Sequence, residues 1–196
     1  MISRDADRDS TLLSTVPASS FIRQGIFHNL YGIVKFLPSP VGDFLRLGLI
    51  WLFGGNVQFS WIRDGLTVYY PWRLSIGKHC WINEYCHFNA YGGIRIGNNI
   101  LMGHRTTIMS DDHVFDDPDK PILVQGRIGE EVVIEDDVFI GSNVFIGKGV
   151  RVGKGAVIGA GSVVLKNVEP YAIVVGNPAR LVRYRRPELN PPTAQG

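Results

Sequence analysis

A repeat of six residues is the feature of this 196-residue sequence that most constrains its fold. From Ile76 onward a large apolar residue recurs at every sixth position, with two interruptions. A period of six fits neither a helix, which needs about 3.6 residues, nor a single alternating strand, which needs about 2. In eight of the repeat positions the next residue is glycine. The thirteen repeat positions are Ile76, Ile82, Phe88, Ile96, Met102, Ile108, Ile128, Ile134, Ile140, Ile146, Val152, Ile158 and Val164.

Six residues make one short strand and one corner, so three such units close a triangular coil. The large apolar residue points into the prism, and glycine or asparagine forms the corner, because both tolerate positive φ better than other residues. Asn83 and Asn89 fill this slot in the first coil. The repeat therefore predicts an all-β solenoid, a parallel β-helix whose coils stack through parallel ladders.

The longest interruption separates Ile108 from Ile128, a distance of 20 residues where the period expects six. The extra residues predict an extruded loop over 110–126, because insertions in solenoids form surface loops, often on the working face. The loop holds five aspartates and His113. As a group the aspartates are consistent with a solvated acidic loop.

Composition excludes several classes of protein. Lys and Arg number 20 and Asp and Glu 18, a net charge of +2, which argues against a nucleic-acid-binding protein. Two cysteines cannot form a disulfide framework, and Cys80 and Cys86, six residues apart, are expected to be small core residues. No apolar run reaches the roughly 20 residues that a bilayer span needs. Residues 1–20 are polar, lack the apolar run of a signal peptide and are expected to be disordered, so a cytoplasmic location is expected.

The segments outside the repeat have their own patterns. Residues 21–71 contain two apolar helical stripes and are expected to form a helical cap on the open end of the solenoid. An alternative is peripheral contact of residues 41–55 with the inner face of the membrane. Between Lys166 and Arg186 there are five basic residues and one acidic residue, an excess that suits a polyanionic ligand. A short helix is expected near the end of the 72–186 solenoid, followed by a disordered tail over 187–196.

The runs IGNNILMG, IEDDVFIGSNVFIGKGVRVGKGAVIGAGSVV and VVGNPARLV resemble the hexapeptide-repeat acyltransferases. The resemblance covers residues 72–186 and is nearest to the galactoside, maltose and surface-polysaccharide O-acetyltransferases. It implies a left-handed β-helix, a homotrimer, acetyl-CoA as acyl donor and no metal. It also implies acetyl transfer to a sugar hydroxyl, in the synthesis of a surface polysaccharide or lipopolysaccharide.

The same resemblance indicates the catalytic group. The family's histidine sits at the root of the extruded loop, where TIMSDDHVF places His113. An imidazole suits a general base because it titrates near neutral pH. Asp111 and Asp112 are both candidates to orient the imidazole, and a backbone carbonyl is a third.

The resemblance also assigns binding residues. Its coenzyme A channel corresponds to Gly141, Ser142, Gly159 and Ala160, although the repeat alone would place glycines here too. On the acceptor side, Asn89 and Tyr91 are expected to contact the sugar, and Phe139 stands where several family members have tryptophan. The basic residues expected to bind the nucleotide phosphates are Lys166, Arg180 and Arg183.

Three other functions stay open at this point. The acceptor is alternatively the amine of a nucleotide-linked amino sugar. A zinc protein like the γ-class carbonic anhydrases would need three histidines, but the two nearest the loop, His104 and His113, are nine residues apart. The third alternative is a non-catalytic scaffold.

Overall fold

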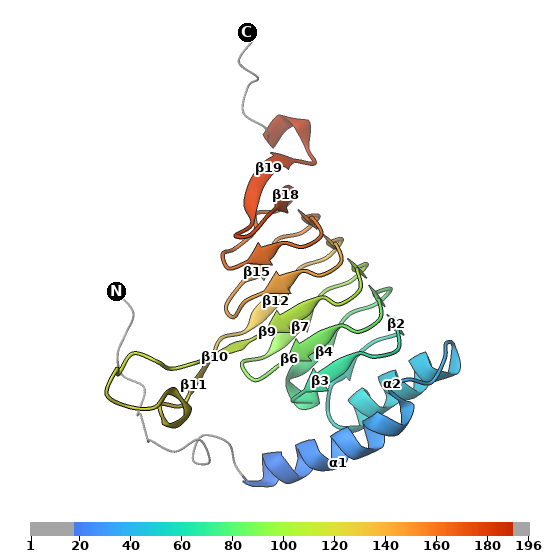
Figure 1. Cartoon of the computed structure of the whole chain (residues 1–196). Coiled ribbons are helices and arrows are strands. Elements are labelled where there is room, and N and C mark those ends of the chain that lie inside the picture. The colour runs from blue at the N-terminus through green and yellow to red at the C-terminus, as the bar shows by residue number, and fades with distance from the viewer. Residues whose placement is uncertain (1–17, 190–196) are drawn as a thin grey trace.

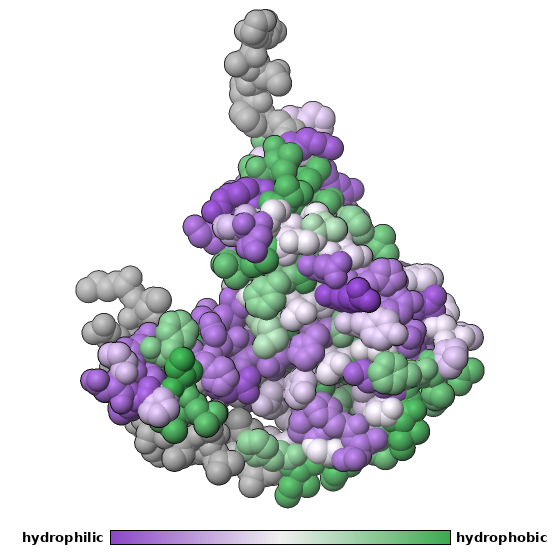
Figure 2. Space-filling model, in the orientation of Figure 1, coloured by the Kyte–Doolittle hydropathy of each residue, from purple (hydrophilic) through white to green (hydrophobic). Residues whose placement is uncertain are grey.

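The computed structural model describes residues 18–189. Two helices, α1 (Ala18–Val34) and α2 (Val41–Leu52), lie across one end of a tapering stack of β-coils (Figure 1). None of the helices in this range is long and apolar enough to cross a bilayer. Hydrophobic residues gather over the helical end of the molecule (Figure 2).

The coils form three parallel sheets, which we call faces A, B and C in the order in which the chain visits them. Face A contains β1 (Asn56–Val57), β4 (Leu74–Ile76), β7 (Ile94–Ile96), β12 (Val132–Ile134) and β15 (Arg151–Val152). Face B contains β2 (Trp61–Ile62), β5 (Trp81–Ile82), β8 (Leu101–Met102), β13 (Phe139–Ile140), β16 (Val157–Ile158) and β18 (Ala172–Val175). Face C contains β3 (Thr67–Tyr69), β6 (His87–Asn89), β9 (Thr107–Met109), β14 (Phe145–Ile146) and β17 (Val163–Val164). This architecture confirms the predicted left-handed parallel β-helix with helices near the N-terminus.

The repeat positions stack in register and form the core. Ile82 pairs with Met102, and Met102 with Ile140, along face B. Every repeat position except Ile128 is buried, and so are Cys80 and Cys86. The repeat positions therefore form a column of apolar residues along each face, and β4, β7 and β12 on face A each add a second buried aliphatic residue.

The reason for glycine after the apolar residue differs from the predicted one. The residue with positive φ lies two positions further on, for example Asn143 (φ 57°) and Gly161 (φ 70°). Gly153, in the slot directly after the apolar residue, is needed for a different reason. A Cβ there would lie 2.5 Å from the backbone nitrogen of Pro170. Close stacking of the coils, rather than backbone conformation, therefore requires glycine at this position.

Two boundaries within the chain differ from those expected. The solenoid begins at Asn56 within the segment assigned to the cap, because Val57, Ile62 and Val68 form a coil without the glycine signature. The extruded segment extends past 126, since Ile128 lies in β11 (Arg127–Gly129), which pairs antiparallel with β10 (Asp111–His113). Ile128 is consequently 44% exposed.

Each chain end also differs in part from expectation. β18 turns back into antiparallel β19 (Arg180–Tyr184), so the expected C-terminal helix is reduced to one 3-10 turn at Pro187–Leu189. Residues 18–20, expected to be disordered, begin α1. The rest of the two expected disordered ends, residues 1–17 and 190–196, lies outside the described residues. Two further 3-10 turns lie at Pro71–Arg73 and, within the extruded segment, at Ile122–Val124.

Candidate functional site

The extruded hairpin leaves the prism at the edge between faces C and A, which we call the C–A edge. Ser110 forms its root and is fully buried. Its backbone nitrogen and its hydroxyl both donate to the carbonyl oxygen of Asn89, at 3.0 and 2.8 Å. The backbone N–H of Glu130 donates to the Ser110 carbonyl at 2.9 Å, which closes the base of the hairpin. The hairpin is thus anchored directly to the coil that carries Asn89.

His113 ends β10 and is exposed, opposite Arg127 in the register. Its backbone N–H donates to Oδ1 of Asp112 at 2.9 Å, and the Asp112 side chain is exposed as well. His113 is therefore accessible from solvent.

Asp111 differs from Asp112 because its carboxylate is buried beside Arg127, with which it forms an ion pair. Burial raises the pKa of Asp111, while the Arg127 charge and the nearby His113 act in the opposite direction. Among the described residues, Asp111 Oδ1 and Arg127 Nε are buried without a hydrogen-bond partner. Of the two carboxylates left open by the sequence, Asp111 is the one held in a fixed, buried position.

Asn89 and Tyr91 lie at the same edge. Asn89 is buried, and its side-chain oxygen accepts a hydrogen bond from the Tyr91 backbone at 3.3 Å. The Tyr91 ring lies against two guanidinium groups, with Arg127 4.7 Å and Arg73 5.6 Å from the ring centroid. The structure therefore brings the predicted catalytic residues together with Asn89 and Tyr91 at the C–A edge, where Arg127 contacts both Asp111 and Tyr91.

Sequence reasoning missed Arg127. Its contacts with Asp111 and Tyr91 depend on the antiparallel pairing of β10 with β11, and the six-residue spacing carries no information about that pairing.

The residues assigned to the coenzyme A channel lie on a different edge, between faces B and C, which we call the B–C edge. Gly141 and Ser142 follow β13, and Gly159 and Ala160 follow β16, one coil further on. A Cβ at Gly141 would lie 2.5 Å from the Ala160 nitrogen, so coil stacking alone requires this glycine. Phe139 lies on face B, 41% exposed, in line with Leu101. Within one chain these residues are separated from the C–A edge by the width of face C.

A carboxylate–imidazole pair also lies on the B–C edge. His104 Nδ1 is 2.6 Å from Glu84 Oε2, and both line a cavity of about 390 Å³ together with Ser142. The sequence analysis considered His104 only as a zinc ligand, since its partner lies 20 residues earlier in the chain. It is a second imidazole near predicted binding residues.

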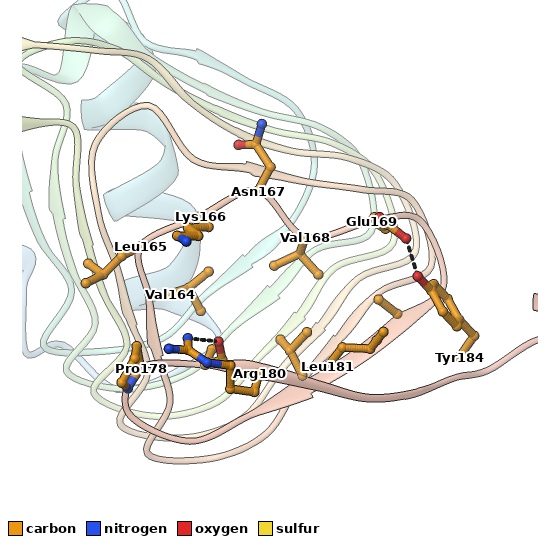
Figure 3. A pocket seen from close by; sticks show the side chains of 13 residues that line it. Val164, Leu165, Lys166, Asn167, Val168, Glu169, Pro178, Arg180, Leu181 and Tyr184 are labelled. Carbon is orange, nitrogen blue, oxygen red and sulfur yellow. Dashed lines mark hydrogen bonds between the residues drawn. The ribbon is translucent and has the colours of Figure 1, made fainter. Parts of the chain in front are cut away.

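Lys166 and Arg180 line one pocket of about 520 Å³ at the C-terminal end of the prism (Figure 3). Its floor is the last layer of the core, with Val164 and Val168, and Pro178 lies beside Arg180. Arg183 is exposed on β19 and does not line this pocket. It pairs with Ile173 of β18, further along the hairpin than Arg180. The predicted phosphate-binding residues are therefore only partly brought together.

No group of three or more His, Cys, Asp or Glu side chains within residues 18–189 is arranged to hold a metal ion.

Comparison with known proteins gives consistent matches. Residues 131–166 match the family described as bacterial transferase hexapeptide (six repeats). A hexapeptide-repeat-containing acetyltransferase from Vibrio cholerae, in complex with acetyl coenzyme A, is 28% identical with a TM-score of 0.77. The match covers 87% of this chain and 91% of that one.

Two further structures share the fold at lower identity. A maltose O-acetyltransferase from Clostridium difficile is 23% identical, with a TM-score of 0.78 over 90% of this chain and 92% of that one. A galactoside acetyltransferase in complex with coenzyme A is 23% identical, with a TM-score of 0.76 over 87% and 84%. The resemblance that the sequence indicates is therefore confirmed: the chain carries the hexapeptide repeat of bacterial transferases on the fold of the hexapeptide-repeat acetyltransferases.

Proposed function

We propose that this protein transfers an acetyl group from acetyl-CoA to a sugar hydroxyl, with His113 as general base. The observation that carries the proposal is the similarity, over nearly the whole chain, to an acetyltransferase with bound acetyl coenzyme A. The C–A edge supports it, because an accessible imidazole there lies on a hairpin anchored to the coil of Asn89.

The proposed reaction is a direct transfer in a ternary complex. His113 takes the proton of the acceptor hydroxyl, and the resulting alkoxide attacks the thioester carbonyl. The tetrahedral intermediate collapses, the C–S bond breaks, and the coenzyme A thiolate receives the proton from His113. The buried Asp111, which is paired with Arg127 on the same hairpin, is the acidic group that we assign to orient the imidazole.

A backbone N–H on the B–C edge would stabilise the oxyanion. The N–H of Gly141 is engaged with the carbonyl oxygen of Ile158 at 2.8 Å. We therefore assign this role to the N–H of Ser142. Asn89 would bind the acceptor through its amide NH₂, since its oxygen already accepts from Tyr91. A surface polysaccharide or lipopolysaccharide is the acceptor class that we propose.

The two edges must come from different chains for this reaction, which supports a homotrimer. If face C of each prism faces a threefold axis, the B–C edge of one chain lies beside the C–A edge of the next. The five strands of face C contain no Asp, Glu, Lys or Arg, whereas face A exposes Arg95 and Arg151 to solvent. The face B strands β2, β5, β8, β13, β16 and β18 are equally free of charged residues, so charge argues only against face A. We place face C at the axis because it lies between the two edges that the reaction needs.

The test combines turnover with donor binding. His113→Ala should lower kcat by about 10²- to 10⁴-fold, the usual contribution of a general base, and leave acetyl-CoA affinity unchanged by calorimetry. Arg180→Ala should weaken acetyl-CoA binding in the absence of any acceptor. Turnover would be followed by thiol release with a panel of sugars and of amino sugars, so that O- and N-acetylation are distinguished.

His104→Ala is the matched control. This imidazole has a carboxylate partner and lies on the other edge of the prism. A His113→Ala enzyme within threefold of the wild type, beside a His104→Ala enzyme that is inactive, would transfer the general-base role to His104. Absence of acetyl-CoA binding by the folded protein would contradict the proposed function as a whole.

A further inference from the structure

Helix α2 buries its charged residues and exposes its apolar ones, the reverse of an ordinary surface helix. Its buried side carries a charged pair, Asp43 and Arg46, together with Ile50. Its solvent side contains only apolar residues and one glycine. These are Val41, Phe44, Leu45, Gly48, Trp51 and Leu52. A surface helix normally places its apolar stripe toward the core and its charges outward.

Helix α1 continues the same surface. It packs Phe27 and Tyr31 against the prism. On its opposite side Ile22, Ile26, Leu30 and Ile33 are spaced three or four residues apart and are exposed. Ile33 is 73% exposed and Trp51 on α2 is 66% exposed. We call the outward sides of the two helices the cap face, and it forms the hydrophobic end of the molecule in Figure 2.

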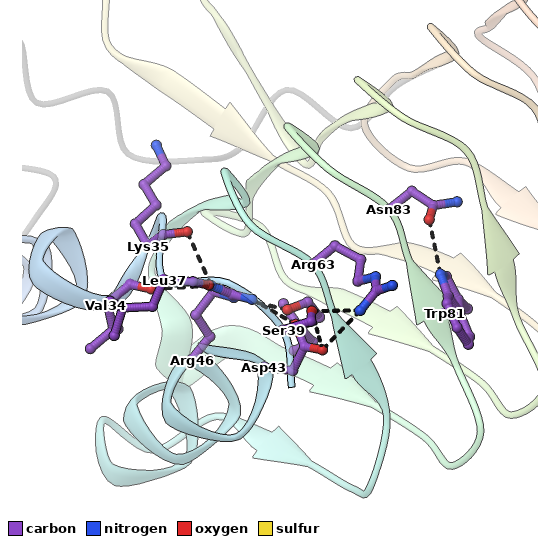
Figure 4. A network of polar contacts seen from close by, with 10 residues as sticks. Val34, Lys35, Leu37, Ser39, Asp43, Arg46, Arg63, Trp81 and Asn83 are labelled. Atoms are coloured by element: carbon purple, nitrogen blue, oxygen red, sulfur yellow. Dashed lines mark hydrogen bonds and ion pairs between the residues drawn. The ribbon is translucent and has the colours of Figure 1, made fainter. Parts of the chain in front are cut away.

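A polar network, not an apolar core, holds the helices in this orientation (Figure 4). Arg46 is fully buried. Its guanidinium donates to the carbonyl oxygens of Leu37 and Ile62, both at 2.8 Å, and to Asp43 at 2.6 Å. Arg63 reaches the same carboxylate at 3.2 Å. Because these partners fix α2 against the first coil, its apolar residues are left on the outside.

Charge identifies the kind of surface that would cover the cap face. Between residues 18 and 63 the only carboxylate is Asp43, which is buried and paired. Arg23 and Lys35, which donate to the Phe53 carbonyl and the Thr67 hydroxyl, leave the helical segment with a net positive charge. A second copy of the cap face would bring like charges together. The negative charges of an anionic lipid headgroup layer would instead attract these positive side chains.

We propose that the cap face docks on the surface of an anionic phospholipid bilayer. The helices would lie in the interface, because neither is long and apolar enough to span it. Trp51, at the end of α2, is the type of residue that is enriched at the boundary between headgroups and acyl chains. This inference is independent of the acyl-transfer proposal, because docking requires no donor or acceptor.

The experiment is flotation of the full-length protein with vesicles of phosphatidylcholine containing 30% phosphatidylglycerol, and with vesicles of pure phosphatidylcholine. We expect the protein to float with the anionic vesicles and to be released at high salt. The variant Ile33→Gln/Trp51→Gln should lower the partition coefficient at least tenfold. Both side chains are largely exposed, so folding should be retained, and thermal unfolding by circular dichroism checks this.

Val182→Gln is the matched control, since Val182 is 59% exposed at the opposite end of the solenoid and should not affect flotation. Wild-type protein that stays at the bottom of the gradient would overturn the proposal. Equal flotation of the wild type and the double variant would overturn it too, because the contact would then lie elsewhere. Vesicle-free self-association that the double variant abolishes, without flotation, would assign the cap face to a second copy instead.

Discussion

Arg46 shows how a single side chain sets the arrangement of a whole segment. It is the largest fully buried side chain among the described residues, and it donates to carbonyl groups near the end of α1 as well as to Asp43 on α2. Carbonyls at a helix C-terminus lack partners within the helix. The guanidinium provides those partners from the next helix and so joins the two.

Replacing Arg46 by methionine should therefore be strongly destabilising. The substitution leaves Asp43 buried with only Arg63 as cationic partner, and breaking a buried pair typically costs about 3–5 kcal/mol. Urea unfolding of the wild type and of Arg46→Met measures this loss. The double variant Arg46→Met/Asp43→Asn should recover part of it, because the uncompensated charge is gone. A loss below about 1 kcal/mol in the single variant would contradict a structural role for the network.

Cys86 gives a prediction about alkaline pH. Burial raises the pKa of its thiol from 9.0 to about 12. In the unfolded chain the thiol ionises above its ordinary pKa, whereas in the folded protein it stays protonated. Its contribution to stability is therefore complete below pH 9 and is lost as the pH rises from 9 to 12.

Between pH 8 and pH 10 this thiol should account for a loss of about 1 kcal/mol in the free energy of unfolding. Urea unfolding at the two pH values, compared between the wild type and Cys86→Ala, isolates the contribution. The variant should show the smaller pH dependence, although the cavity lowers its stability at both values. An unchanged difference between the two pH values would mean that the thiol titrates normally in the fold.

Among the secondary-structure elements, the glycines have opposite roles in helices and in coils. Gly32 lies on the exposed side of α1, and an added Cβ would meet nothing within 4 Å. Gly153 follows β15, where a Cβ would lie 2.5 Å from the backbone of the next coil. Backbone atoms in a stacked ladder cannot move aside as a flexible side chain can.

Gly32→Ala should consequently raise stability by about 0.5–1 kcal/mol, the difference in helix propensity. Gly153→Ala should lower it by about 1–3 kcal/mol, a typical cost of overpacking. Thermal unfolding of the two variants beside the wild type measures both changes. If Gly153→Ala were neutral, the coils would be less tightly stacked than the structure indicates.

Sequence periodicity predicted the coils because each repeat position demands a buried apolar residue, and Ile76 to Val164 supply it. It missed the first coil, since Val57, Ile62 and Val68 are spaced five and six residues apart and none precedes a glycine. It misplaced Ile128, which keeps the phase of the repeat but lies in a hairpin. For the candidate site, spacing located the loop root but not Arg127, because cross-strand neighbours depend on pairing and not on sequence distance.

For the whole molecule, the separation of the two edges has a direct functional consequence. If the C–A edge of one chain works with the B–C edge of another, two different inactive chains can complement each other. A chain with His113→Ala retains its B–C edge, and a chain with Ala160→Trp retains its C–A edge. Such sharing of one site by two subunits follows from a closed ring with head-to-tail interfaces.

Equal amounts of the two variants, unfolded together and refolded, should regain about one quarter of wild-type turnover. In a randomly mixed ring half of the C–A edges and half of the B–C edges are intact, so about one quarter of the sites combine two intact edges. The measurement is thiol release from acetyl-CoA before and after mixing. Each variant refolded alone is the control and should stay inactive. Mixtures that remain inactive while forming mixed trimers would place both halves of the site within one chain.

The closed base of the extruded hairpin has an evolutionary consequence. Ser110 and Glu130 are hydrogen-bonded across it, and the next coil resumes in register at Val132. Residues between these points can therefore be inserted, deleted or exchanged without shifting any layer of the core. The rest of the hairpin beyond β10 is free to diversify, while the prism beneath it is constrained at every sixth residue. Chains built on this scaffold can therefore differ in this hairpin without having to change how they fold.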